Sequence, residues 1–599
     1  MRRAAGRCIS RLARGGTPAR EERLAKRTTA FGDALAFLDR TRRLRPIDLV
    51  LVLALVGIPA LVAGLARQWG GAYRPAIEID LSFSALPRYA LLSLSRGVAA
   101  YALSLAFTLG YGYWAAKDRA AERVLVPLLD VLQSIPVLGF MPGVVLALVA
   151  AFPRSNVGLE LAAIVMIFTG QAWNMTFSYY HSLRTVPHDL AEVGRLYRFG
   201  RLRQLAWIEL PFSVIGLVWN SMMSMAGGWF FLMVSEAFVL GTHDFRLPGL
   251  GSYMSVAAAR GDRGAMAASV VAMAALIVLL DQLIWRPAVV WSQRFRLDDA
   301  GRADEASSWV YDALRRSRLV AWLEAARRRA TDRAARPRRA PRPRPADGSW
   351  TTRVFPALLL TVLAGLLAWA AIASAALIRG VPAAEWRSIL IDAGLTLARV
   401  LAAVALGTLW TLPAGLAIGL NPRVSRVLQP IVQVLASFPA PMLFPAVVAA
   451  LHALGIGLGL GSVLLMLLGT QWYVLFNVVA GATAIPADLR EASALFRLSR
   501  WQRFRSLYLP AVFPHLVTGW VTAAGGAWNA SIVAEYVTFR GETLVGRGLG
   551  SRISEAAAQG RFGVLAASVA VMAALVVAFN RLVWRRFHAL AETRFSLVR

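Results

Sequence analysis

Ionisable side chains within long hydrophobic stretches are the residues of this sequence that could do chemistry. Glu236 and Glu535 are the last residues of the segments GGWFFLMVSE and GAWNASIVAE, each of which ends such a stretch. Arg96 and Arg399 each lie early in another stretch. Charged groups inside a bilayer are costly, so they are functional candidates by default. The six histidines show no metal-ligand spacing, and no catalytic triad can be assembled. We therefore expect no catalytic residue, no metal site and no enzyme.

The two glutamate segments are predicted to form a gate or part of a translocation pathway, because their glycines permit close helix approach or local unwinding. The alternative is a tight helix contact with a glutamate that reaches the outer interface. A carboxylate repels an anion, so the glutamates are assigned to gating or hydrogen bonding. The predicted pathway residues are Gly227, Gly228, Trp229, Glu236, Gly526, Trp528, Asn529 and Glu535.

Arg96 and Arg399 are the candidates for attracting an anion. The alternative is that each is an interfacial arginine whose long side chain reaches the polar headgroups.

Composition sets the class of protein in which these residues act. The chain has 599 residues, of which 57% are hydrophobic and 17% charged, with a formal net charge of +31. Soluble domains average about 25% charged residues, and disordered chains are poor in hydrophobic ones. Both classes are excluded, and a polytopic membrane protein remains. Cys8 is the only cysteine, which excludes an intramolecular disulfide and any multi-cysteine metal site.

Hydrophobic runs predict an all-α membrane protein with about twelve membrane-spanning helices, since about 20 apolar residues cross a bilayer. The third span of each set is proline-rich, which predicts a broken helix near a cavity, with a simple kink as the alternative. Arginine-rich segments alternate with charge-poor ones, which places both termini in the cytoplasm. The predicted spans are 48–68, 89–114, 124–152, 157–181, 208–240 and 264–285, then 354–378, 389–419, 427–453, 457–481, 510–537 and 563–583.

The second half of the chain repeats the first. Adding 299 to Pro187, Glu192, Glu236 and the Gly-Leu-Gly at 249–251 gives the same residues, and upstream an offset of 303 relates Arg96 to Arg399. The chain is thus two tandem six-helix units, and same-orientation copies relate by a pseudo-two-fold axis along the membrane normal. Such an arrangement can enclose a central path.

These features predict seven regions. Segments rich in arginine are interpreted as solvated cytoplasmic flanks, with anchoring to anionic lipid or nucleic acid as the alternative; we expect the bilayer and no nucleic acid as partner. Residues 308–330 could form an amphipathic surface helix. The regions are a basic N-terminal segment (1–46), a first span with its external loop (47–88), transmembrane domain 1 (89–286), an Arg/Pro-rich linker (287–353), a further span with its loop (354–388), transmembrane domain 2 (389–585) and a tail (586–599).

One predicted cytoplasmic loop is unusual in both copies. Residues 187–211 and 486–510 each begin with a proline, carry acidic residues in the first helical turn and then alternate apolar residues with arginines. The pattern predicts two short helices, of which the second begins at Gly200 in one copy and at the capping box Ser499–Gln502 in the other. An apolar face outside the bilayer needs a cover, so a two-fold symmetric cytoplasmic partner is predicted.

The spacing of Glu192, Ile208 and Pro211, and of Glu491, Leu507 and Pro510, resembles the "EAA" loop of permeases in bacterial type I ABC importers. Within that family the chain is most similar to the nitrate/sulfonate/taurine branch and its duplicated anion permeases. The resemblance implies that the loops dock on the ATPase and couple its hydrolysis to transport. The implied coupling residues are Glu192, Val193, Gly194, Arg198, Gly200, Pro211, Glu491, Ala492, Ser493, Arg497, Ser499 and Pro510.

The resemblance also implies partners: a cytoplasmic ABC ATPase homodimer that holds ATP and Mg²⁺, and a periplasmic binding protein that delivers a small anion across a bacterial inner membrane. No Gly-Lys pair occurs, so the Walker A loop is absent and the ATPase is another chain. Arg198 and Arg497 replace the family's glycine six residues after the glutamate, and we expect the turn to shift to Gly200 and Ser499.

A secondary carrier of 6+6 architecture, driven by an ion or proton gradient, is the rival. Its diagnostic is a charged loop between spans two and three, as in residues 115–123, but residues 421–426 do not repeat that pattern. A structural or lipid-scrambling membrane protein is the third alternative, and it gives no reason for the paired loops.

Overall fold

The structure is a computed structural model that describes residues 78–295 and 372–595, apart from gaps at 135, 198 and 241–242, together with residues 308–317 and a few positions between 320 and 369. The predicted N-terminal segment, the span at 48–68, most of the linker and most of the span at 354–378 lie outside the described residues. The chain divides into two units, residues 64–307 with 346–599 and residues 1–63 with 308–345.

The smaller unit is represented by helix α14 (Trp309–Arg316), part of the amphipathic helix that the sequence predicts over 308–330. Ser308 caps this helix, because its Oγ accepts a hydrogen bond from the backbone N–H of Tyr311 at 3.2 Å. Arg315 and Arg316 lie in the last turn, where positive charge suits the helix dipole.

The larger unit holds both copies of the repeat. The first copy contains η1 (Phe83–Ala85), α4 (Leu86–Lys117), α5 (Arg119–Ser134), α6 (Val137–Ala151), α7 (Val157–Arg184), α8 (His188–Leu196), α9 (Arg201–Gln204), η2 (Leu205–Glu209), α10 (Leu210–Glu236), β1 (Val239–Leu240), β2 (His243–Asp244), α11 (Leu250–Arg260), α12 (Arg263–Leu280), η3 (Asp281–Trp285), α13 (Arg286–Ser292) and η4 (Gln293–Phe295).

The second copy repeats this order. It contains α17 (Ala383–Leu420), α18 (Pro422–Ser437), η5 (Ala440–Leu443), α19 (Phe444–Ala453), α20 (Leu458–Thr483), α21 (Ala487–Leu495), α22 (Arg500–Arg503), η6 (Phe504–Tyr508), α23 (Leu509–Ala534), β3 (Tyr536–Phe539), β4 (Glu542–Val545), α24 (Leu549–Ala558), α25 (Phe562–Phe579), η7 (Asn580–Trp584) and α26 (Arg585–Arg594).

The all-α membrane architecture predicted from the sequence is confirmed. Eight helical segments in the described part are long and apolar enough to cross a bilayer, or nine if one bent pair counts as a span. They correspond to the second, fourth, fifth and sixth predicted spans of each copy. The two predicted first spans lie wholly or largely outside the described residues, so the full twelve are not seen.

The third span of each copy is broken, as its prolines predict. In the second copy, Pro422–Ser437 and Ala440–Ala453 meet at a bend of 81°. In the first copy, α5 ends at Ser134 and the short apolar α6 begins at Val137, directly after Pro136. Proline lacks a backbone N–H, so each break removes helical hydrogen bonds and leaves backbone groups available to other partners.

Each broken helix packs against the other copy. Helix α6 contacts α23 and α25, while α18 contacts α10 and α12, and η5 also contacts α10. Gly139 of α6 faces Val569 of α25, where an added Cβ would lie 3.1 Å from the valine side chain. Because each copy packs its broken helix against the other copy, the interface between the copies runs through the centre of the bundle.

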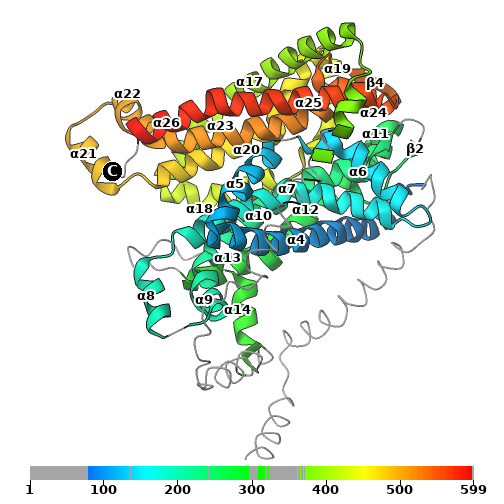
Figure 1. The fold of residues 1–599 in the computed structure, drawn as a ribbon. Coiled ribbons are helices and arrows are strands. Elements are labelled where there is room, and N and C mark those ends of the chain that lie inside the picture. The colour runs from blue at the N-terminus through cyan, green and yellow to red at the C-terminus, as the bar shows by residue number, and fades with distance from the viewer. Residues whose placement is uncertain are drawn as a thin grey trace, which may run out of the picture. The chain divides into compact units, whose positions relative to one another are not determined.

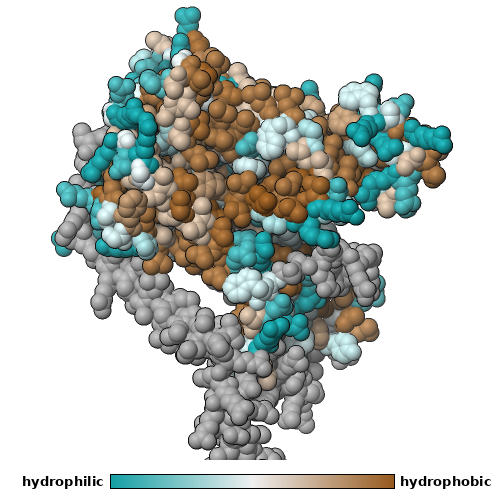
Figure 2. All heavy atoms as spheres, turned by 180° about the vertical axis from the view of Figure 1, so that it is seen from behind, coloured by the Kyte–Doolittle hydropathy of each residue, from teal (hydrophilic) through white to brown (hydrophobic). Residues whose placement is uncertain are grey.

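The two ends of the bundle differ. One end, which we call the loop end, carries α8, α9, α21 and α22; the other, the hairpin end, carries both β-hairpins with α11 and α24 (Figure 1). The hairpins are antiparallel, with Val239 paired to Asp244 and Tyr536 paired to Val545. Figure 2 shows a largely hydrophobic face between these two more hydrophilic ends, as expected of a membrane-spanning bundle.

Candidate functional site

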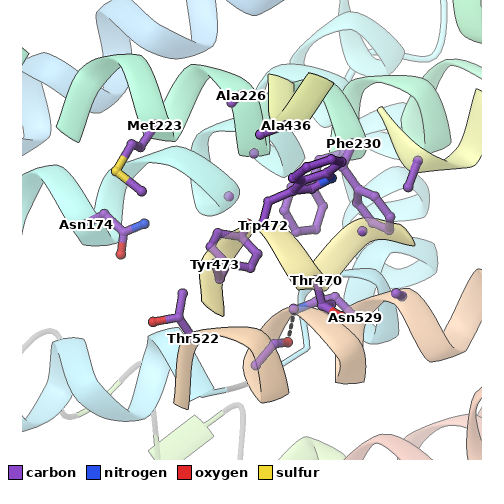
Figure 3. Close-up of a pocket in the computed structure, with 18 of the residues that line it drawn as sticks. Asn174, Met223, Ala226, Phe230, Ala436, Thr470, Trp472, Tyr473, Thr522 and Asn529 are labelled. Carbon is purple, nitrogen blue, oxygen red and sulfur yellow. Dashed lines mark hydrogen bonds between the residues drawn. The ribbon is translucent and has the colours of Figure 1, made fainter. Parts of the chain in front are cut away.

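A cavity of about 180 Å³ lies between the two copies. Helices α5, α6, α7 and α10 of the first copy and α18, η5, α20 and α23 of the second copy contribute to its wall. Figure 3 shows side chains from both copies around this space, among them Asn174, Met223 and Phe230 of the first copy and Trp472, Tyr473 and Thr522 of the second. The central path expected from the duplication therefore has a counterpart in the structure.

The lining is polar and aromatic but carries no formal charge. None of the residues around the cavity is Asp, Glu, Lys, Arg or His. In the described part of the chain, the side-chain amides of Gln133, Asn174 and Gln433 make no hydrogen bond to the protein, so their donors and acceptors are available to a solute. Without a fixed charge, such a wall can bind a small polar molecule only through neutral hydrogen-bonding groups.

Asn529 joins the two copies at this cavity. Its Oδ1 accepts a hydrogen bond of 2.7 Å from the backbone N–H of Val137, the first residue of α6. Helix N-termini leave such N–H groups without intrahelical partners, so the asparagine supplies what the helix lacks. The first copy has Phe230 at the matching position, and this bridge is therefore made once.

The predicted pathway residues separate into two groups. Gly227, Gly526 and Asn529 line the cavity. The tryptophans Trp229 and Trp528 are buried in the hydrophobic core instead. Gly228 faces Gln171. Glu236 and Glu535 lie at the hairpin end. A role for these residues in gating stays a prediction.

Each of the two buried glutamates accepts a matching set of hydrogen bonds. Glu236 accepts from the Ser93 hydroxyl at 2.8 Å, from Arg96 Nη1 at 2.7 Å and from the backbone N–H of Gly251 at 2.9 Å.

In the second copy, Glu535 accepts from the Thr396 hydroxyl at 2.9 Å, from Arg399 Nη1 at 2.8 Å and from the backbone N–H of Gly550 at 2.9 Å. We call these two clusters the carboxylate sites. The first site joins α4, α10 and α11, and the second site joins α17, α23 and α24. A buried carboxylate is tolerated because these donors replace water.

The repeated Gly-Leu-Gly is explained by these sites. Its first glycine follows the glutamate by 13 residues in both copies. An added Cβ at Gly249 or Gly548 would lie 2.3 Å from the carboxylate of Glu236 or Glu535, so no side chain fits there. The leucine N–H donates to the Ser93 or Thr396 hydroxyl, at 3.0 and 2.8 Å.

Arg96 and Arg399 are brought to the carboxylate sites, away from the cavity wall. Arg96 is fully buried, and its guanidinium contacts both Glu160 and Glu236. Arg399 pairs with Glu535 and keeps 14% of its side chain exposed. That these arginines attract an anion stays a prediction; the donors of Arg96 face two carboxylates.

At the loop end, both copies present large apolar side chains to solvent. Leu196 is 80% exposed and Leu495, at the matching position, is 82% exposed. Tyr197 and Leu202 of the first copy, and Phe496 and Trp501 of the second, extend the same surfaces. We call these matched surfaces the docking knobs. Large exposed apolar side chains gathered at matching positions are typical of protein–protein or membrane interaction sites.

The implied coupling residues build these knobs. Glu192 is exposed and lies 3.3 Å from His188, one helical turn away. Gly194 is buried, and an added Cβ would be 3.0 Å from Ile208, so a small residue is required there. Val193 and Glu491 are exposed, Ala492 and the two prolines Pro211 and Pro510 are half-buried, and Ser493 is buried in the position of Gly194.

The expected shift of the turn to Gly200 and Ser499 is wrong where the structure tests it. Arg497 itself adopts the left-handed conformation, with φ of 50°. Gly200 and Ser499 have φ of −69° and −62°, and they cap α9 and α22. The second copy thus keeps the turn at Arg497, a position where glycine is favoured. Arg198, the matching residue of the first copy, lies outside the described residues. The predicted capping box at Ser499–Gln502 is confirmed.

An ion pair between a buried glutamate and a partly exposed lysine joins the first knob to the bundle. Glu209, the last residue of the π-helical turn η2, lies 2.6 Å from Lys117 at the end of α4. The matching residue of the second copy, Tyr508, ends the π-helical turn η6. The wide π turns thus recur at the base of both knobs, and such turns are frequent at functional sites.

Comparison with known proteins decides the family. The model of the family described as "Binding-protein-dependent transport system inner membrane component" matches residues 108–284 and, a second time, residues 411–594. The chain belongs to this family. The double match shows that it is a duplicated permease, as its internal repeat predicts.

Curated relatives of this permease include nitrate, bicarbonate and taurine transport permeases. It is 31% identical over 139 residues to the nitrate import permease protein of Leptolyngbya laminosa, covering 22% of the chain and 48% of that protein. It is 28% identical over 197 residues to the bicarbonate transport system permease protein of a Synechocystis species, covering 29% and 69%. For the taurine transport system permease protein of Escherichia coli the identity is 28% over 185 residues, covering 31% and 62%. The permease thus spans about half the length of the nitrate relatives it matches.

Some site residues of the permease were missed by sequence reasoning. Ser93, Glu160 and Thr396 were not singled out, because nothing in the linear pattern shows that they meet a glutamate on another helix. One usable signal was present: the Gly-Leu-Gly recurs at a fixed distance from the glutamate in both copies.

Gly548→Ala should destabilise the permease, because the new Cβ would overlap the carboxylate of Glu535. Overpacking of this kind costs about 1–3 kcal/mol. The detergent-purified variant should therefore melt at a lower temperature than the parent. Gly394→Ala, on α17, is the matched control, because an added Cβ there meets open space. Equal melting temperatures for the two variants would contradict this account of the carboxylate site.

Arg497→Val should loosen the turn of the second docking knob, since a β-branched residue is poorly tolerated at positive φ. Hydrogen exchange at the backbone N–H of Leu498, which donates to the Ser493 carbonyl at 3.2 Å, should accelerate. Arg497→Gly should keep or slow that exchange, because the left-handed conformation costs other residues about 1–2 kcal/mol. Arg500→Val, at a helical position, is the control, and equal effects of the two valines would refute the assignment.

Proposed function

We propose that this chain is the membrane-spanning subunit of an ATP-driven importer. In this proposal a cytoplasmic ATPase homodimer binds the two docking knobs. A periplasmic binding protein delivers a small solute at the hairpin end. ATP and Mg²⁺ are held by the ATPase chain. The carrying observation is the pair of matched knobs, whose apolar side chains are exposed at equivalent positions of the two copies.

The repeated shape of the knobs favours a symmetric partner. Both consist of a nine-residue helix, a tight turn, a four-residue helix and a π turn that leads into a long helix. Two equivalent surfaces fit two equivalent subunits, and a homodimer supplies these by its two-fold symmetry. An ion-driven carrier needs no such partner and leaves the exposed leucines unexplained.

The basic loop end supports an orientation with the docking knobs in the cytoplasm. Arg195, Arg201 and Arg203 lie on the first knob, and Arg500 and Arg503 lie on the second. Short cytoplasmic segments carry the excess of positive charge. We therefore propose a bacterial inner-membrane location with both termini in the cytoplasm and the hairpin end facing the periplasm.

We further propose that the solute is a small anion that passes through the central cavity. Support comes from the nitrate, bicarbonate and taurine permeases among the relatives. The cavity size and its available amide groups suit a small oxyanion held by neutral donors. A glycine betaine/proline betaine permease of Salmonella typhimurium is also similar, at 27% identity over 175 residues, so the test below compares solutes.

Replacing Leu196→Ser and Leu495→Ser together should abolish solute-stimulated ATP hydrolysis by the reconstituted complex, because both apolar contacts with the ATPase are lost. Copurification of the ATPase should fall in parallel. Leu454→Ser, at a similarly exposed apolar residue of the hairpin end, is the control and should leave copurification of the ATPase intact. The charge-reversing pair Glu192→Lys and Glu491→Lys should have the same effect as the serine pair. Solute uptake at full rate without any ATPase would instead favour the ion-driven carrier.

Asn174→Cys in a Cys8→Ser background should make uptake sensitive to a bulky thiol reagent, because the modified side chain fills the cavity. Nitrate, bicarbonate, taurine and glycine betaine should be measured side by side as solutes. Leu454→Cys provides the control, since its modification lies outside the cavity. Full uptake after complete modification at position 174 would exclude the cavity as the path.

A further inference from the structure

The guanidinium of Arg96 in the first carboxylate site has all of its edges engaged. Its Nε and Nη2 donate to the two carboxylate oxygens of Glu160, at 2.5 and 2.7 Å. Its Nη1 donates to Glu236 at 2.7 Å and to the Pro248 carbonyl at 2.9 Å. The contact with Glu160 is the planar, bidentate kind that arginine makes with carboxylates.

The second copy lacks the carboxylate of Glu160. The matching residue, 299 positions later, is Gly459, and it occupies the equivalent place, since an added Cβ there would lie 3.7 Å from Nη2 of Arg399. Arg399 keeps its Nη1 contact with Glu535 at 2.8 Å. Among the described residues, no acidic side chain meets its Nε or Nη2.

This open edge of Arg399 can be reached from outside the bundle. The side chain is 14% exposed, whereas Arg96 is fully buried. Gly455 and Gly457, which precede α20, face open space, whereas Gly546 packs against the backbone of Leu458 and Gly459 on the other side of the first turn of α20. Arg399 does not line the central cavity, and this place is therefore separate from the path proposed for the solute.

Charge also favours an added anion. The first site combines one arginine with two glutamates, for a formal net charge of −1, whereas the second combines one arginine with one glutamate, for a net charge of zero. One bound monoanion would give the second site the charge that the first carries. A guanidinium edge that is mostly removed from water without a partner is costly, and an anion relieves that cost.

We propose that Arg399, together with the first turn of α20, binds a small planar oxyanion of the carboxylate type, which takes the place that the Glu160 carboxylate has in the first copy. Nitrate, bicarbonate and formate share this planar geometry. The bound anion joins α17 to α20 as Glu160 joins α7 to α4. The site thereby makes the packing of the second copy depend on an anion from solution.

The test uses the purified full chain in detergent and sodium formate as the probe, with sodium chloride at equal ionic strength as the reference. The melting temperature should rise saturably with formate, by a shift on the order of 2 °C. Arg399→Gln should remove the formate-specific rise. Gly459→Glu should raise the melting temperature without formate and remove the response to it, since the chain then supplies its own carboxylate.

The first copy provides the reciprocal variant. Glu160→Gly opens the same edge on Arg96, so this variant should melt at a lower temperature and gain a larger formate response than the parent. Coinciding formate and chloride curves for the parent, or a full formate response in Gly459→Glu, would overturn the proposal. Neither result bears on the importer function, because the measurement involves no ATPase and no transport.

Discussion

Burial of carboxylates away from water is the constraint on which the hairpin end depends. Glu236 and Glu535 are fully buried, and each accepts hydrogen bonds from a hydroxyl and a guanidinium of one long helix and from the backbone of the short helix after the hairpin. Removing one partner of such a buried pair typically costs about 3–5 kcal/mol. The requirement for these donors fixes α4, α10 and α11 relative to one another in the first copy, and α17, α23 and α24 in the second.

One long helix of each copy, α10 or α23, runs from the docking knob past the cavity to the carboxylate site. In the first copy, α10 starts at the π turn below the docking knob, passes the cavity at Gly227 and ends at Glu236 in the carboxylate site. Helix α23 follows the same course in the second copy. One continuous helix therefore links each knob to the cavity wall and to the buried carboxylate at the far end.

Periodicity and repetition along the chain predicted most of the architecture, because long apolar runs have few alternatives to a spanning helix. The breaks before Val137 and at Pro439 followed from proline chemistry. The contact of Arg96 with Glu160 could not be predicted, since spacing along a chain does not show which helices become neighbours. The left-handed Arg497 was mispredicted because local preference disfavours that conformation, and the surrounding turn overrides it.

The single bridge from Asn529 to the backbone of α6 has an evolutionary consequence. In a permease assembled from two identical chains, any substitution at the dyad appears twice, and a contact that suits only one side is penalised by its mirror image. Covalent fusion of the halves lifts that restriction. Each half can then change independently of the other, as the one-sided contact of Asn529 illustrates.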